Sequence, residues 1–242
     1  MFEDLKQKLG FAYKKVFETH KYFSTDEVFI SIKESISGKD YIVIKGNDFI
    51  ILDSECKIIE GSKEKFPEVF FMHYLLYKTY PFMNSIISSD SKWLSVWAAT
   101  GKALPPVTML HSRNYFGEIP CATKIPDISD TNNIYVKIGK SVLETLSTKF
   151  VYQCPAVFVR ALGAIVWGLD ENQTLSRLFC LEEIAERTYL AGIKMMERFS
   201  YLPYELSLKN YLSKKDSLPL EEQINKNDFL EQWVKNCEEL LK

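Results

Sequence analysis

Between residues 28 and 61 the chain carries four short apolar runs, and their spacing constrains the fold more than any other feature. The runs are VFISIK at 28–33, DYIVIK at 40–45, DFIILD at 48–53 and CKIIEG at 56–61. They are rich in β-branched residues, and the turn-forming sequences Ser-Gly-Lys-Asp and Gly-Asn separate the first three. These spacings predict an antiparallel β-meander.

Helical patterns lie on both sides of this meander. Residues 3–19 place apolar side chains at helical spacing, which predicts an amphipathic helix packed on a sheet. After the meander, Pro67 and Glu68 suit the first turn of a helix, because proline loses no hydrogen bond there and a carboxylate faces the positive end of the dipole. We expect this helix to run to about Tyr80 and to end at Pro81.

Strand and helix patterns then alternate. The buried run NSIIS at 84–88 predicts a strand, and residues 91–101 predict a helix. A second cycle places a helix at 131–149 and a strand at 157–168, before a helix cap at Asp170 begins a long apolar-faced helix. This mixture predicts a two-layer or three-layer α/β arrangement with a largely antiparallel sheet.

The chain divides by composition into one domain over residues 1–200 and a helical C-terminal extension over residues 201–242. The polar linker SKKDSLP joins two helical patterns in this extension. The second pattern carries an apolar stripe that suits contact with another subunit, formed by Leu230, Trp233, Cys237 and Leu240.

Charge and cysteine usage exclude several classes of partner. The 30 basic and 32 acidic residues give a formal net charge of -2, which provides no general attraction for nucleic acid or anionic lipid. No apolar run approaches the roughly 20 residues that cross a bilayer. Five widely spaced cysteines without a C-x-x-C motif are typical of a reduced chain. We therefore expect a soluble, cytoplasmic protein that binds neither nucleic acid nor membrane.

A series of blocks along the chain carries its most specific pattern. The blocks are E-x-x-x-x-H-x-x-x-Y at Glu68, His73 and Tyr77, then Pro81, WAATGKALP at 97–105, GEIPC at 117–121 and LGAIVWGLD at 162–170. In order and spacing they resemble the class II aldolase/adducin family, which includes L-fuculose-phosphate aldolase and L-ribulose-5-phosphate 4-epimerase. The resemblance covers about residues 5–198. It implies a layered α/β/α fold with helices on both faces of a largely antiparallel sheet.

The metal ligands of that family do not match this sequence. In its active enzymes a His-x-His strand and a third histidine hold zinc, which acts as a Lewis acid in carbon–carbon cleavage or inversion. The resemblance places Ser88 and Asp90 at the paired histidines and Leu162 at the third. Serine is a poor zinc ligand and leucine is none, so we expect no metal site and no cofactor. A weakly held, oxygen-liganded divalent ion at Asp90 is the alternative.

The family's catalytic carboxylate corresponds less clearly. Its Ser-Ser-Glu segment matches residues 67–69, which places Val69 at the catalytic glutamate. A shift of one residue would give this role to Glu68. Adjacent residues on a helix point about 100° apart, so such a shift changes the direction of the side chain. A simple dipole partner is the other interpretation of Glu68. Asp90 is the second catalytic candidate. The candidates for substrate binding are Lys45, Gly46, Ser88 and His73.

The resemblance implies that Lys45 and Gly46 would form half of a phosphate site. The other candidates have simpler structural explanations. His73 lies among apolar helix residues and suits a packed histidine, as does His111 in its loop. Serine and aspartate in SISSDSKW at 85–93 suit the N-cap of the following helix.

Taken together, these observations predict a degenerate class II aldolase-like protein that is not a zinc-dependent aldolase. We expect it to act as an oligomeric binding or assembly subunit, because the resemblance implies a homo-oligomer, with a tetramer as the family's form. The alternative is an active aldolase, lyase or epimerase on a small sugar or sugar phosphate, with a non-standard metal site or none. A third hypothesis is a sugar or nucleotide-sugar binding module without turnover.

Overall fold

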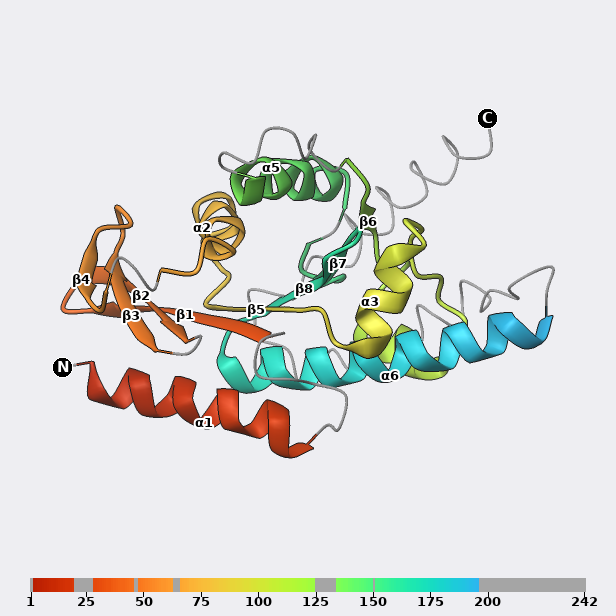
Figure 1. Cartoon of the computed structure of the whole chain (residues 1–242), viewed down its shortest axis with the longest axis horizontal. Coiled ribbons are helices and arrows are strands. Elements are labelled where there is room, and N and C mark those ends of the chain that lie inside the picture. Colours follow the sequence, from red (N-terminus) through yellow and green to blue (C-terminus); the bar gives the residue numbers. More distant parts are fainter. Residues whose placement is uncertain are drawn as a thin grey trace, which may run out of the picture.

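A single mixed sheet organises the computed structural model, which describes residues 2–19, 28–45, 48–62, 66–124, 134–149 and 151–195 (Figure 1). The strands are β1 (Val28–Ile36), β2 (Lys39–Lys45), β3 (Phe49–Asp53), β4 (Ile58–Glu60), β5 (Ser85–Ser89), β6 (Cys121–Ala122), β7 (Ala156–Val159) and β8 (Gly163–Gly168). The helices are α1 (Glu3–Thr19), α2 (Phe70–Thr79), α3 (Lys92–Ala99), α4 (Met109–Asn114), α5 (Ile134–Leu146) and α6 (Glu171–Met195). The strand order is β4-β3-β2-β1-β5-β8-β7-β6, and each pair except β6 with β7 is antiparallel.

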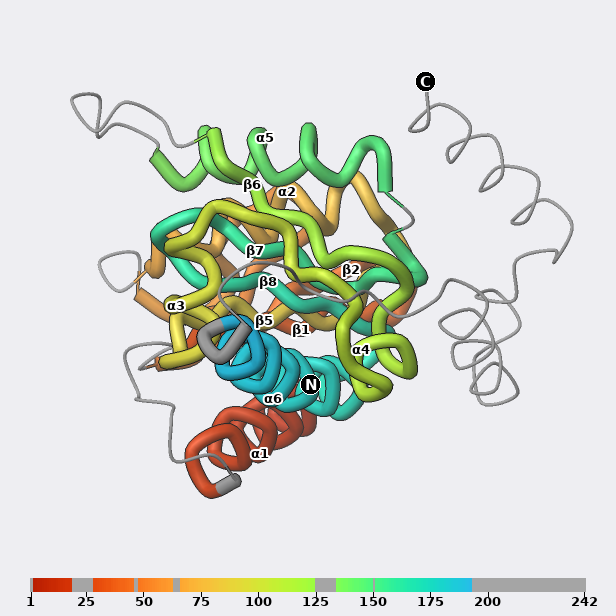
Figure 2. Tube along the Cα trace, turned by 90° about the vertical axis from the view of Figure 1, so that its right-hand side faces the viewer, coloured from red at the N-terminus to blue at the C-terminus, as the bar shows by residue number. Residues whose placement is uncertain are grey.

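Helices cover both faces of this sheet, which confirms the layered α/β/α fold. Helices α2 and α5 pack together on one face, while α1, α3 and α6 lie on the other (Figures 1 and 2). Each face has its own core of buried side chains. The sheet is therefore buried on both sides along its centre, as the fully buried strand β5 illustrates.

The predicted N-terminal elements are confirmed. Helix α1 has the expected bounds and buries the apolar stripe formed by Leu5, Leu9, Ala12 and Val16. Strands β1 to β4 form the predicted meander. Ser37 and Gly38 connect β1 to β2 with φ values of 53° and 76°, and two such residues in succession match the right-handed twist of a tight hairpin.

The prediction of one strand over residues 157–168 was wrong. This segment is a hairpin in which β7 pairs antiparallel with β8, and its turn places Ala161 at a φ of 64° and Gly163 at 106°. Both strands are buried on both faces, so apolar side chains fill the segment on either side of the turn, and the single polar residue Arg160 does not mark the turn clearly. A Cβ atom at Gly163 would lie 2.1 Å from the Ser89 carbonyl oxygen, so this turn approaches the end of β5 very closely.

The helix starts also differ from the sequence prediction in part. Asp170 caps α6 as predicted, since its Oδ1 accepts from the Gln173 N–H at 2.7 Å. Ser91 occupies the N-cap position of α3, but its side chain makes no capping hydrogen bond. The buried carboxylate of Glu182 on α6 caps α3 instead. It accepts from the Trp93 N–H at 3.0 Å and from the Ser91 hydroxyl at 2.5 Å. Burial raises the pKa of Glu182.

Two short elements of the fold were not predicted from the sequence, and the predictions for the C-terminal region lie outside the described residues. Helix α4 and the short strand β6 were not predicted. The predicted boundary at residue 200 and the extension over 201–242 lie outside the described residues. Within the described residues, no helix combines the length and apolar character needed to cross a membrane.

Candidate functional site

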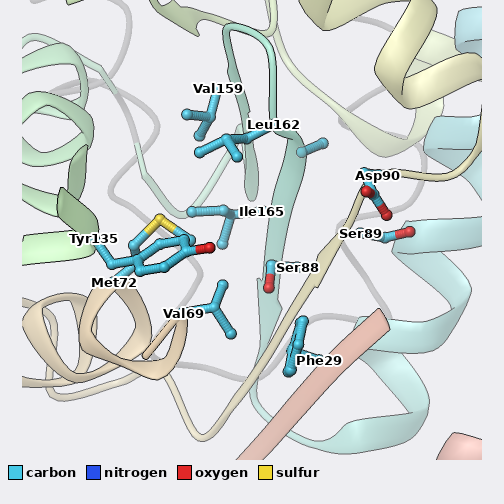
Figure 3. A pocket seen from close by; sticks show the side chains of 11 residues that line it. Phe29, Val69, Met72, Ser88, Ser89, Asp90, Tyr135, Val159, Leu162 and Ile165 are labelled. Carbon is cyan, nitrogen blue, oxygen red and sulfur yellow. The ribbon is translucent and has the colours of Figure 1, made fainter. Parts of the chain in front are cut away.

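A cavity of about 300 Å³ lies at the end of the two central strands β5 and β8, where β5 ends and β8 begins. It opens on the face that α2 and α5 cover, and Figure 3 shows the side chains around it. The residues that line it are Phe29, Val69, Met72, Ser88, Ser89, Asp90, Tyr135, Val159, Leu162, Ala164 and Ile165. Most of this lining is apolar, so the few polar groups determine what the pocket can bind.

The structure brings together the three positions that the sequence resemblance matches to the family's metal ligands. Ser88, Asp90 and Leu162, referred to below as the ligand positions, all line this cavity. Pairing of β5 with β8 explains the arrangement, since Ser88 lies opposite Ile165 and the β7–β8 turn carries Leu162 beside the end of β5. Leu162 is 36% exposed although it is apolar, because it projects from this turn.

Glu68 and Val69 lie differently with respect to the cavity. Val69, which the unshifted alignment matches to the family's catalytic carboxylate, lines the cavity. Glu68 is exposed and lies in a tight turn before α2, where its carbonyl accepts from the Phe71 N–H. The helix proper begins at Phe70, so the expected first-turn position of Glu68 was wrong. Glu68 therefore does not line the cavity in which the shifted alignment would make it catalytic.

Behind Ser88 lies a buried polar network. The Ser88 hydroxyl is 3.1 Å from Nε2 of His73, and Nδ1 of the same ring is 2.8 Å from the Ser31 hydroxyl. The Tyr77 hydroxyl donates to the Ser31 carbonyl at 2.9 Å, and its oxygen is also 2.9 Å from the Ser31 hydroxyl. His73 is 1% exposed and does not line the cavity, so Ser88 lies between it and any molecule bound there.

Burial determines the ionisation of this network. The loss of solvation lowers the pKa of His73 to about 3, and it raises the pKa of Tyr77 well above its usual range. Both groups are therefore neutral at physiological pH. A histidine with so low a pKa is a weak proton acceptor, so the pair does not activate Ser88 as a nucleophile.

The remaining predicted residues lie elsewhere. Lys45 pairs with Ile30 across the sheet and extends on the face of α1, with its ammonium 4.8 Å from the Tyr13 ring and 5.0 Å from the Phe49 ring. That face is opposite the cavity, so Lys45 is not placed to contact a ligand there. Gly46 lies outside the described residues.

Of the two other histidines, His111 lies within the described residues and has a structural role. His111 is fully buried, and its Nε2 donates to the Gly117 carbonyl at 2.7 Å. Burial lowers its pKa to about 4. Its prediction as a packed histidine is confirmed, and His20 lies outside the described residues.

The donors around the cavity do not fit a zinc ion of the family's kind. One ligand position is a hydrocarbon, and the Ser88 hydroxyl is already hydrogen bonded to His73. Asp90 alone has a charged oxygen. Across the described ranges, no group of three or more His, Cys, Asp or Glu side chains is placed to hold a metal ion. Firm zinc binding takes three or four histidine, cysteine or carboxylate ligands, and the ligand positions offer one carboxylate, so this set is unsuited to zinc.

Two residues of the cavity and its polar network were not identified from the sequence. Tyr135 enters the cavity from α5, and Figure 3 shows its hydroxyl directed toward the side that Ser88 lines. Ser31 on β1 supports His73 from the opposite side. No local motif marks either residue, because each contributes through a long-range contact. Only the alternation of β1, which turns Ser31 toward α2, offered a signal.

Comparison with known proteins agrees with this architecture. The family model described as "Class II Aldolase and Adducin N-terminal domain" matches residues 24–189. The L-ribulose-5-phosphate 4-epimerase UlaF of Salmonella paratyphi C is 26% identical over 155 residues, which cover 64% of this chain and 68% of that enzyme.

Solved structures show the same fold at lower identity. A structure of L-fuculose 1-phosphate aldolase superposes with a TM-score of 0.72 at 17% identity, covering 88% of this chain and 97% of the other. The L-fuculose 1-phosphate aldolase of Glaciozyma antarctica PI12 gives 0.62 at 14% identity, covering 84% and 78%. With a family match over most of its length and the layered sheet that positions this cavity, the chain belongs to the class II aldolase and adducin family.

Proposed function

We propose that this chain is a degenerate class II aldolase-like protein that binds a small sugar-like ligand in the cavity without zinc-dependent cleavage. One observation carries the proposal. The three ligand positions line one pocket, yet they present a hydroxyl, a carboxylate and a hydrocarbon. On this proposal the family's pocket is retained, while the side chains that would hold a metal ion are replaced.

The proposal extends to assembly as an oligomer, with a tetramer as the first expectation. Its support is the family membership and the presence of large exposed apolar side chains on the outer helices, including Phe11 at 61% and Leu190 at 47% exposure. Packing surfaces and metal ligands are separate sets of residues, so an interface can persist after the chemistry is lost. Light scattering after size exclusion tests this part, and a monomer at micromolar concentration would contradict it.

Ligand-dependent stability tests the binding role. The chain is titrated with a panel of sugars and sugar phosphates that includes L-ribulose and L-ribulose 5-phosphate, with and without added zinc. A ligand of the native state raises stability by about 2.7 kcal/mol at a hundredfold excess over its Kd. We expect stabilisation by at least one compound and no zinc-dependent turnover. Zinc-dependent cleavage or epimerisation of a sugar phosphate would refute the proposal.

A second candidate is an active carbon–carbon lyase or epimerase that works without the family's zinc site. The observation that favours it is the carboxylate of Asp90, which lines the cavity beside Ser88. A carboxylate in that position can move a proton at a bound sugar. Turnover that needs no zinc and is lost in Asp90→Asn would support this candidate over the binding role.

A further inference from the structure

The hydrogen bonds behind Ser88 have a direction, and that direction limits what the cavity can bind. Four short contacts join Ser31, His73, Tyr77 and Ser88. The Tyr77 hydroxyl has one proton, which goes to the Ser31 carbonyl because a carbonyl can only accept. The contact between the Tyr77 and Ser31 hydroxyls therefore uses the Ser31 proton.

The direction of the Ser31 hydrogen bond also determines the tautomer of the His73 ring. Since the Ser31 proton is used toward Tyr77, Nδ1 of His73 must carry a hydrogen to complete its 2.8 Å contact with Ser31. The ring is neutral because burial lowers its pKa to about 3, so Nε2 has only a lone pair. The contact of 3.1 Å between Nε2 and Ser88 then requires the Ser88 proton. This is the only assignment that places one proton in each of the four contacts.

Ser88 consequently presents its oxygen lone pairs to the cavity, with its proton turned away. The second polar group of the ligand positions, the Asp90 carboxylate, also only accepts hydrogen bonds and carries negative charge. Among the described residues that line the cavity, none is lysine or arginine. The lining therefore favours hydrogen-bond donors and disfavours anions.

We infer that His73, through the direction of its hydrogen bond to Ser88, selects a neutral polyhydroxylated ligand of sugar size over a sugar phosphate. The inference rests on the proposed binding function and names its ligand class. His73 is a positioning residue, because it lies behind Ser88 and touches no ligand. Ser88 accepts a ligand hydroxyl, and Asp90 accepts a second while repelling phosphate. A volume of about 300 Å³ is within the range of small-molecule pockets.

The first test reads the ring protonation directly in the wild-type protein. The chain has three histidines, so correlation spectra of the ring nitrogens are simple to assign. At pH 7 we expect the hydrogen of His73 on Nδ1. His111 provides an internal reference with the opposite tautomer, because its Nε2 must donate to the Gly117 carbonyl. A His73 hydrogen on Nε2 would overturn the inference without any ligand being present.

The second test compares L-ribulose with L-ribulose 5-phosphate by calorimetry or by NMR titration at low salt. L-Ribulose should bind more tightly, and Ser88→Ala should weaken it about three- to tenfold, which is the usual value of one hydrogen bond. Ser85→Ala is the matched control: it makes the same change on the same strand, where the Ser85 hydroxyl has no hydrogen-bond partner in the described part of the chain. This control should leave the affinity unchanged.

Asp90→Asn separates charge from hydrogen bonding. It should increase the affinity for L-ribulose 5-phosphate several-fold and change that for L-ribulose less, because it removes the repulsion of phosphate but keeps an acceptor oxygen. If the phosphorylated sugar binds more tightly to the wild type, the inference fails and the binding function stands. If neither sugar binds, the binding function itself fails.

Discussion

Gly163 gives the sharpest test of the geometry around the cavity, because the β7–β8 turn approaches β5 only where a side chain is absent. Its φ of 106° is one that residues with a Cβ atom rarely adopt. A Cβ atom there would lie 2.1 Å from the Ser89 carbonyl oxygen and 2.7 Å from the Asp90 Cα. Both neighbours are backbone atoms at the end of a buried central strand, so neither can move aside as a flexible side chain would.

The expected cost of Gly163→Ala has two parts. The unfavourable φ costs about 1–2 kcal/mol for a residue other than glycine. The steric overlap adds about 1–3 kcal/mol, the usual cost of overpacking a well-packed interior. We therefore expect a loss of about 2–5 kcal/mol in the free energy of unfolding, which is a large share of the 5–15 kcal/mol that typical domains have.

Gly117→Ala is the matched control for this measurement. Gly117 has a similar positive φ of 74°, but nothing lies within 4 Å of an added Cβ atom, so only the backbone term applies. Urea unfolding followed by tryptophan fluorescence, with Trp167 buried on β8, gives both free energies. Gly163→Ala should lose at least 1 kcal/mol more than its control, as the overpacking term implies. Equal losses would refute the close approach of the turn to β5 and, with it, the shape of the cavity.

Two further predictions concern pH and metal. Burial lowers the pKa of His73 to about 3 and that of His111 to about 4, below the usual 6.5, so the unfolded chain binds more protons and stability is lost as pH falls through this window. Each histidine should contribute up to about 1.4 kcal/mol per pH unit. Glu182, whose pKa burial raises, opposes this. Urea unfolding at pH 7, 6 and 5 measures the slope; a flat profile would contradict the burial of both rings. Histidines at all three ligand positions together should create zinc binding measurable by calorimetry, and failure to bind zinc would argue against their convergence on one pocket.

The local elements of the fold were largely predictable, because local pattern determines them. Helix α1 and the meander follow from apolar periodicity and from the Ser37-Gly38 turn. The hairpin over 156–168 was not recognised, because both strands are buried on both faces and the short turn between them carries a single polar residue, Arg160. The capping of α3 was assigned to the wrong side chain, since Glu182 is remote in sequence and reaches the helix only through tertiary packing.

The site followed from the resemblance rather than from local pattern. Alignment to the family identified Ser88, Asp90 and Leu162, and the structure places all three around one cavity. Glu68 was a weaker candidate because a shift of one residue changes which side of the chain faces the pocket, and Val69 occupies that place instead. Tyr135 could not have been found, since only the packing of α5 over the sheet brings it to the cavity.

The zinc content of the purified chain tests the central claim most directly. The protein is expressed with ample zinc, freed of loosely bound ions by dialysis, and measured by elemental mass spectrometry against its own concentration. A pocket with a hydroxyl, a carboxylate and a hydrocarbon at the ligand positions should retain far less than one zinc ion per chain. One tightly held zinc ion per chain, lost on mutation of Asp90, would contradict the account.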